Sequence, residues 1–481
     1  MTYKIKVFGG WVLISLFVLF FLSCNSSESE TYEDIDAATG LSVLDGIKSR
    51  GKLIAVTGNN SLDYFIYKGD PMGYQLEMAE AFANELGVKL EIIIESNPNE
   101  AIRLLEDGKA DIIAMDLPIT LQYNRRLDYA VPFTQTRLVL VQQKRPAALK
   151  TVSTNEVDTK LITTPLSLAG KTLYIPDDPF LSTRVESLMQ EIGDTIYVVR
   201  MNERSSEELI GMVSTGEIEY TLAEERLAGI NASIYSNLDI STPVSFQYHV
   251  TWAVKKDAKG ILKRLNEWYV SYIASHDGTV LYGKYYKSSR ISRISESRYY
   301  SGRNGIISDY DNLLRPLGRA IGWDWRMLAS LIYQESAFKT NRTSYAGAFG
   351  IMQMMPATAE IYGIDSSSSP SQQIVAGVRY IQWLENQWKD IILDPDERLK
   401  FVLASYNVGL GHVLDARRLA TKYGRNPNVW QDSVEFFLES KSSPEFYTDA
   451  TVYYGYCMGD QPVKYVNEII GRYSHYRKFY N

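Results

Sequence analysis

The chain has 481 residues, of which 45% are hydrophobic and 22% are charged, and its formal net charge is −7. This length predicts two or three domains, and the composition is that of folded rather than disordered protein. The negative charge and the lack of a basic stripe or nucleic-acid motif in the sequence exclude nucleic acid as a favoured partner. The 34 Tyr and 8 Trp would suit contact with sugar rings, although most aromatic side chains fill protein cores.

The N-terminus predicts an export signal. Lys4 and Lys6 precede an apolar run over residues 11–22, which is short for a membrane-spanning helix, and the run ends at Phe-Leu-Ser-Cys. This ending resembles a bacterial lipobox, which implies that residues 1–24 are a lipoprotein signal peptide and that Cys24 is lipidated. The alternative is an uncleaved signal anchor. Both predict a protein tethered to a membrane of the cell envelope, and we expect the outer membrane, facing the periplasm.

The second cysteine, Cys457, is expected to be a small core residue, because a lipidated Cys24 cannot form a disulfide. The four histidines form no cluster with cysteines or carboxylates at the spacing of metal ligands. We therefore expect neither a metal nor a cofactor. Residues 25–43 are acidic and polar, which predicts a flexible tether between the lipid and the first domain.

Strands that alternate with helices over 44–290 predict two α/β lobes. The expected strands are 52–57, 90–94 and 111–115 in the first lobe and 171–175, 196–201 and 218–222 in the second, with helices at 73–86, 99–106, 181–191 and 205–213. We expect lobe 1 to comprise about 44–145 and 247–290, and lobe 2 about 146–246. A cleft between two such lobes is the natural place for a ligand.

Segments along this region resemble, in order, the periplasmic solute-binding proteins for amino acids: GKLIAVTGNN, GYQLEMAEAFANELGVKLE, GKADIIAMDLPIT, YAVPF, AVKKD, LNEWY and DGTVLYGKYY. That family places an arginine for the ligand carboxylate six residues before YAVPF, where this chain has Tyr123; Arg125 and Arg126 are nearby. By the same resemblance, Glu224 or Glu225 would pair with a ligand amine. The resemblance implies an amino acid or a muropeptide as ligand, and a scaffold without ligand is the alternative.

Residues 291–303 lie in the Ser- and Arg-rich stretch SSRISRISESRYYSGR, which predicts a linker or a hinge strand. Beyond it, residues 304–481 have a helical pattern. Expected helices run from 325 to about 337, from 374 to 388, over a stripe from 399 to 406, and from 462 onward. The fold class is therefore multidomain, with a two-lobed α/β domain followed by a mainly α domain.

Glu335 is the unusual residue of the first of these helices. Leu328, Leu331 and Ile332 form an apolar stripe, and Glu335 completes the i, i+3, i+4, i+7 set. A carboxyl held in an apolar wall has a raised pKa, which suits a general acid for glycosidic bond cleavage. Asp324 lies about 16 Å away along the helix, too far to act with it, whereas Asp309 and Asp311 remain open as second acids.

Four motifs in order resemble those of the family-one lytic transglycosylases, which have a goose-type-lysozyme-like fold: Glu335-Ser336, Gly350-Ile351-Met352-Gln353, Ser405-Tyr406-Asn407 and Tyr465. A solute-binding domain before such a domain, behind an export signal, resembles the membrane-bound F type. The GIMQ motif is the one feature more typical of other branches of the family.

The resemblance implies a lyase that acts on peptidoglycan glycan strands and leaves 1,6-anhydro-MurNAc ends. Glu335 would be the catalytic acid and base. Ser344 would bond Glu335 or the acetamido group, Met352 and Gln353 would line the cleft, and Asn407 would orient the N-acetyl group. Tyr406 and Tyr465 would contact sugar. The alternatives are a lysozyme-like hydrolase and a non-catalytic receptor that grips the cell wall.

Overall fold

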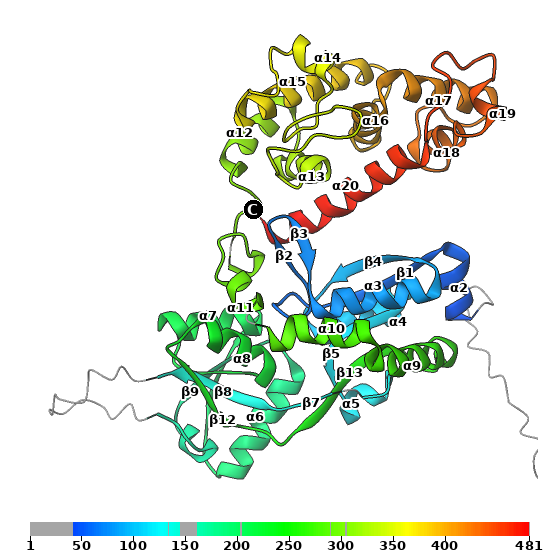
Figure 1. Ribbon diagram of the computed structural model, residues 1–481. Helices are drawn as coiled ribbons and strands as arrows, with labels where there is room; N and C mark the ends of the chain where they lie inside the picture. Colours follow the sequence, from blue (N-terminus) through cyan, green and yellow to red (C-terminus); the bar gives the residue numbers. More distant parts are fainter. Residues whose placement is uncertain are drawn as a thin grey trace, which may run out of the picture.

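The computed structural model describes residues 42–480 except 133, 145–160, 203, 289 and 304. Cys24, the expected signal peptide (1–24) and most of the expected tether (25–43) lie outside the described residues. A two-lobed α/β part is followed by a helical part, which confirms the predicted fold class (Figure 1). Within the described ranges, none of the helices combines the length and apolar character needed to cross a membrane.

Lobe 1 is built on a six-stranded sheet in the order β4-β1-β5-β13-β6, with β7 paired to β13. The strands are β1 (Lys52–Thr57), β4 (Lys89–Ile94), β5 (Ile112–Pro118), β6 (Leu127–Tyr129), β7 (Thr134–Thr136) and β13 (Tyr248–Lys255). The helices are α2 (Val43–Arg50), α3 (Tyr74–Leu86), α4 (Pro98–Glu106), α5 (Leu121–Asn124), α9 (Lys259–Ala274) and α10 (His276–Tyr282), followed by the short π-helix η3 (Gly283–Lys287). β1 runs parallel to β4 and β5, as alternating strands and helices predict.

Lobe 2 repeats this plan in a five-stranded sheet of order β10-β9-β11-β8-β12. Its elements are β8 (Leu138–Gln143), η2 (Pro165–Leu168), β9 (Thr172–Pro176), α6 (Pro179–Ile192), β10 (Tyr197–Met201), α7 (Ser206–Thr215), β11 (Thr221–Glu224), α8 (Glu225–Ile234) and β12 (Leu238–Pro243). The expected lobe boundary at 145/146 needs correction, because β8 pairs antiparallel with β11 and β12. An apolar run such as LVLVQQ fits either sheet, so the sequence does not say which one it joins.

The segment expected to be a linker, 291–303, is folded against lobe 1 rather than extended. It contains α11 (Arg290–Ser295) and the turn η4 (Ser301–Arg303). Ile291 and Ile294 are buried in the same core cluster as α3 and α9. Apolar residues at this spacing on a Ser- and Arg-rich background are too few to reveal a helix by pattern alone.

The helical domain surrounds α13. Its elements are α12 (Asp311–Ile321), α13 (Trp325–Ser336), α14 (Pro356–Ile361), α15 (Pro370–Trp388), α16 (Pro395–Val408), α17 (Leu410–Lys422), η5 (Trp430–Val434), α18 (Glu435–Ser440), α19 (Pro444–Tyr447) and α20 (Asp460–Phe479). Leu328, Leu331 and Ile332 are fully buried in its core, which confirms the predicted apolar stripe. Because α13 is packed by other elements on most sides, the Glu335 carboxyl on this stripe is largely removed from water.

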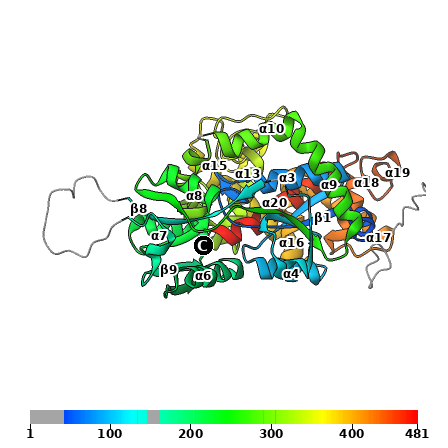
Figure 2. The ribbon, with the colours of Figure 1, turned by 90° about the horizontal axis from the view of Figure 1, so that it is seen from below.

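The two parts meet where the hairpin of β2 (Phe65–Tyr67) and β3 (Asp70–Met72) reaches α20, as Figure 1 shows. Figure 2, seen from below, draws α20 across the same region as α3 and β1 of lobe 1. The Tyr476 hydroxyl donates to the Gly69 carbonyl over 2.7 Å. The Tyr64 hydroxyl lies 2.6 Å from Nδ1 of His475, and its ring stacks on Phe479 with centroids 5.7 Å apart. The C-terminal helix is therefore shared between the helical domain and lobe 1.

Gly69 tests the importance of this contact. Its φ is +82°, and an added Cβ would lie 2.6 Å from the Tyr476 hydroxyl and 2.7 Å from Tyr333. Gly69→Ala therefore combines left-handed strain of about 1 kcal/mol with displacement of two side chains. We expect its melting temperature in calorimetry to fall further than that of Gly51→Ala. Gly51 has a φ of +65° with nothing within 4 Å of an added Cβ, so it isolates the strain; equal losses would contradict the contact.

Candidate active site

Glu335 lies in the last turn of α13. Asp324 caps the start of this helix by accepting from the Arg326 amide over 2.9 Å, as predicted. Ala337, with a φ of 50°, ends the helix in the left-handed conformation. The end of the helix leaves Glu335 partly accessible, whereas Leu331 and Ile332 before it are fully buried. The carboxyl is thus embedded in protein and still open to a substrate.

Loss of water around the Glu335 carboxyl raises its pKa to about 7, from an ordinary value of 4.5. The Tyr465 hydroxyl donates a hydrogen bond to Oε1 of Glu335, and the charge of Arg342 acts in the same direction; both lower the pKa, but less than burial raises it. A carboxyl of this kind is divided between its acid and base forms near neutral pH, as an acid that later acts as a base requires.

Two tyrosines from distant helices face this acid. Tyr465 comes from the first turns of α20, and Tyr406 comes from the end of α16. The Tyr406 hydroxyl donates to the Met352 carbonyl over 2.8 Å. Burial and the charge of Glu335 raise the pKa of both tyrosines well above 10, so both remain hydrogen-bond donors. The structure therefore brings Tyr406 and Tyr465 close to Glu335, and their predicted contact with sugar stays a prediction.

The loop between α13 and α14 is held by side chains of the predicted motifs. The buried Ser336 hydroxyl donates to the Ile351 carbonyl over 2.8 Å and so ties this loop to the residue next to Glu335. Nε2 of Gln353 donates to the carbonyls of Gly350 over 2.7 Å and Arg342 over 3.0 Å. Gln353 is thus a brace of the loop, and through Arg342 it is linked to the charge that acts on Glu335.

Met352 needs correction as a predicted cleft residue, and one of the two alternatives for Ser344 is not seen among the residues that the structure describes. The Met352 side chain is 1% exposed and packs against Gly377, so this residue contributes its carbonyl rather than a cleft wall. The Ser344 hydroxyl accepts from the Ala348 amide over 3.0 Å inside a tight turn, and no bond from it to Glu335 is found among the described residues. Its own proton is available to a substrate. Asn407 is exposed at the end of α16, beside Tyr406.

The three aspartates considered as second acids are engaged elsewhere. Asp309 pairs with Arg298, and Asp311 accepts from the Ile307 amide over 2.9 Å. Asp324 forms an ion pair with Arg326 at 2.6 Å. In the described part of the chain, the polar groups that act on Glu335 are a tyrosine and an arginine.

Sequence reasoning missed Arg342 and Gln373. Oε1 of Gln373 accepts from the Ile351 amide over 3.0 Å, and its amide nitrogen donates to the Ser368 carbonyl over 2.9 Å. Gln373 therefore fixes the GIMQ turn from α15. Neither residue belongs to the four motifs that resemble the family. The one feature of the sequence that could have pointed to Arg342 is that it is a basic residue in the loop after Glu335.

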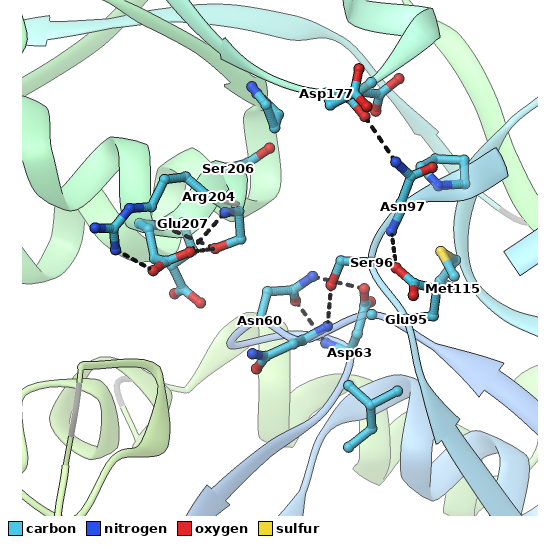
Figure 3. Close-up of a pocket in the computed structure, with 18 of the residues that line it drawn as sticks. Asn60, Asp63, Glu95, Ser96, Asn97, Met115, Asp177, Arg204, Ser206 and Glu207 are labelled. Atoms are coloured by element: carbon cyan, nitrogen blue, oxygen red, sulfur yellow. Dashed lines mark hydrogen bonds and ion pairs between the residues drawn. The ribbon is translucent and has the colours of Figure 1, made fainter. Parts of the chain in front are cut away.

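A cavity of about 610 Å³ lies between the two lobes (Figure 3). Its acidic lining residues outnumber its basic ones: Asp63, Glu95, Asp177, Asp178, Glu207 and Glu208 face Arg204 and Lys478. Nδ2 of Asn97 in lobe 1 donates across the cleft to the Asp177 carbonyl of lobe 2 over 3.3 Å. Lys478 and Phe479 belong to α20, so the helix that carries Tyr465 also reaches this cleft.

The predicted ligand residues Tyr123, Arg125 and Glu224 are not among the residues that line this cavity. Tyr123 is 1% exposed in an apolar cluster, and Arg125 is on the surface. Glu224 is bound to Arg226 over 2.8 Å, and the same guanidinium binds Asp116 over 2.6 Å. The guanidinium of Arg226 thus occupies the Glu224 carboxylate, which would otherwise be free to pair with a ligand amine.

Known proteins match both halves of the chain. Residues 317–429 match the model of the transglycosylase SLT domain, and residues 54–288 match that of bacterial extracellular solute-binding proteins, family 3. A membrane-bound lytic murein transglycosylase F of Desulfosudis oleivorans is 32% identical over 89% of this chain and 90% of its own length. The chain belongs to the membrane-bound lytic murein transglycosylase F family.

A relative of the same name from Serratia proteamaculans is 29% identical over 89% of this chain and 84% of its own length. Among solved structures, an arginine-binding protein mutant from T. maritima has a TM-score of 0.43 at 21% identity, covering 51% of this chain and 100% of its own. Membership in the transglycosylase F family confirms a peptidoglycan lytic transglycosylase, which is a lyase, and excludes the non-catalytic receptor. The GIMQ motif therefore does not separate the F type from other branches.

Glu335 links stability to pH in a testable way. Its pKa is raised in the fold, so the neutral form is favoured below the unfolded value of 4.5 and this stabilisation is lost as pH rises through about 7. Glu335→Gln keeps the neutral shape at every pH. We expect the variant to melt at a higher temperature than wild type at pH 8, with a smaller difference at pH 5. Calorimetry at the two pH values measures this, and a difference that is independent of pH would contradict the raised pKa.

Proposed function

We propose that Glu335 is the general acid and then the general base in cleavage of the β-1,4 bond between MurNAc and GlcNAc, with 1,6-anhydro-MurNAc as the product end. The supporting observation is a carboxyl with a pKa of about 7 whose polar neighbours are Tyr465 and Arg342. Glycosidases that use water or an enzyme nucleophile place a second carboxylate near the acid. A single acid fits a substrate that supplies its own nucleophile.

In the first step, the Glu335 carboxyl gives its proton to the glycosidic oxygen as the bond from that oxygen to C1 of MurNAc breaks. The carbonyl oxygen of the MurNAc N-acetyl group forms a bond to C1 from the other face, which gives an oxazolinium ion. In the second step, the Glu335 carboxylate takes the proton of the C6 hydroxyl. The C6 oxygen then bonds to C1 and releases the acetamido oxygen, so no water is consumed and Glu335 regains its proton.

The surrounding residues would act by position. Tyr465 holds Oε1 of Glu335, and Tyr406 ties its helix to the GIMQ turn through the Met352 carbonyl. Asn407, exposed beside Tyr406, would orient the N-acetyl group. Ser344, with a free hydroxyl proton, would donate to the acetamido group. Gln353 would keep the loop in the shape that presents Arg342 to the acid.

Product analysis with Glu335→Gln tests this function. Loss of the acid should reduce murein turnover by about 10²- to 10⁴-fold, the usual contribution of general acid–base catalysis. Mass spectrometry of murein digested by wild type should find anhydro ends, which are lighter by one water than reducing ends. Asp324→Asn is the matched control, because its carboxyl binds Arg326 away from the site. Reducing ends would instead support the lysozyme-like hydrolase.

We also propose that the enzyme works in the cell envelope, held to the outer membrane by a lipid on Cys24 and facing the periplasm. The support is the export signal and lipobox of the sequence, together with the membrane-bound relatives. Peptidoglycan strands in the periplasm would then lie within reach of the catalytic domain.

A regulatory role for the solute-binding domain is a further part of the proposal. The last turn of α20 lines the interlobe cleft with Lys478 and Phe479, while Tyr465 near its start binds Glu335. These positions are about 21 Å apart along one helix. A ligand that changes the shape of the cleft would therefore act on the helix whose Tyr465 lowers the pKa of the acid. The acidic lining favours a ligand with amino groups, such as an amino acid or a muropeptide.

Stem peptides released from murein by an amidase are the probe for this regulation. We expect them to change the turnover of the full chain several-fold, and to do so less in Asp177→Asn, which removes a carboxylate of the cleft. Asp194→Asn, an exposed aspartate of the same lobe outside the cleft lining, is the matched control. Turnover that ignores added peptides in all three proteins would contradict the regulatory role.

A further inference from the structure

The loop between α19 and α20 exposes an aromatic surface that the proposed mechanism does not use. Tyr454 keeps 58% of its surface accessible although its ring rests on Gly411. A Cβ at position 411 would lie 2.5 Å from this ring, so only glycine allows the contact. An aromatic ring supported on one side and open on the other is a platform rather than a core residue.

This platform is connected along the chain to two elements of the candidate active site. Gly411 lies in the first turn of α17, four residues after Asn407, and α16 ends at Val408. The loop then enters α20 at Asp460, five residues before Tyr465. Tyr454 therefore contacts the segment that follows Tyr406 and Asn407, and its loop leads into α20, whose Tyr465 donates to Glu335.

A buried ion pair fixes the loop. The Asp415 carboxylate accepts from the amides of Tyr453 over 2.8 Å and Tyr454 over 2.9 Å. It also pairs with Lys441 over 2.6 Å, and the side chains of both partners are 0% exposed. Because the buried Asp415 carboxylate already orders the backbone of this loop, little further conformational entropy is lost when a ligand binds. The Tyr454 ring is therefore preorganised.

The same ion pair sets the tautomer of His412. Nζ of Lys441 lies 3.0 Å from Nδ1 of His412. An ammonium group can only donate, so Nδ1 must accept and the ring proton must be on Nε2. Burial and the charge of Lys441 lower the pKa of His412, which keeps this neutral form. The ring centroids of His412 and Tyr454 are 6.1 Å apart, so a fixed N–H donor lies beside the platform.

We propose that Tyr454 and His412 form a saccharide subsite for a sugar of the glycan strand beyond the two that flank the cleaved bond. The Tyr454 ring would stack on the C–H face of the sugar, and Nε2–H of His412 would donate to a hydroxyl or acetamido oxygen. Asp415 and Lys441 are positioning residues. This subsite deepens the proposed function and rests on it for the nature of the substrate.

The test compares full-length variants on peptide-free glycan strands. Chain-length analysis counts the cuts, and kcat and KM are determined separately. Tyr454→Ala should raise KM roughly two- to tenfold with little change in kcat, as expected for loss of one stacking contact. Tyr454→Phe should keep a KM near that of wild type. His412→Phe, which keeps a ring and removes the donor, should raise KM by a similar factor.

Tyr453→Ala is the matched control from the same loop. Tyr453 is 75% exposed, but its ring lies 4.3 Å from the guanidinium of Arg418, two turns further along α17. An unchanged KM for Tyr454→Ala, or an equal rise for Tyr453→Ala, would overturn the subsite. If Tyr454→Ala does not fold, Tyr454→Leu keeps apolar contact with Gly411 without an aromatic face and should show the same rise. Chain-length analysis counts cleaved bonds whether the new ends are anhydro or reducing ends. Finding reducing ends would therefore contradict the transglycosylase reaction and would leave the test of the subsite unaffected.

Discussion

The exclusion of water from the Glu335 carboxyl is the constraint on which the catalytic domain depends. Burial of α13 among fully buried residues such as Leu331 and Ile332 would by itself hold the carboxyl neutral. An acid that never ionises could start a cleavage but could not accept a proton to finish it. The hydrogen bond from Tyr465 and the charge of Arg342 bring the pKa back to about 7. A pKa near neutrality at Glu335 therefore requires both the apolar core and these two polar groups.

The C-terminal helix carries much of this arrangement. α20 supplies Tyr465 to the acid near its start, and near its end it supplies Tyr476 to the hairpin of lobe 1 over 2.7 Å. Because a helix is stiff over this length, the place of the hydroxyl at Glu335 depends on how the far end is seated. The proposed regulation by the solute-binding domain would therefore act through this helix on the hydroxyl that is bonded to Glu335.

The solute-binding domain keeps its plan while its polar centre has changed. Arg226 binds both Glu224 and Asp116, and a buried charge of this kind is stable only when its partners are retained. The carboxylate expected to receive an amine is therefore satisfied internally. What remains is the wider cleft lined by Asp177, Glu208 and the end of α20.

The sequence by itself determined the elements whose signal is local. Strand β1 (Lys52–Thr57) has the predicted bounds, Gly87 closes α3 in the left-handed conformation, and Asp324 caps α13. Hydrophobic period, glycine at a cap and a side-chain cap each depend on neighbours within one or two turns, so they can be read without a fold. The same period placed Glu335 on the buried stripe.

Only the tertiary structure decided the features that depend on partners far along the chain. Met352 proved buried because Gly377, twenty-five residues later, leaves room for it. β8 joined lobe 2 because its hydrogen-bond partners are there. Glu224 was already satisfied by Arg226, and the buried pair of Asp415 and Lys441 set the orientation of His412. Long-range burial and pairing fix which surfaces remain free for a ligand, and no local pattern encodes them.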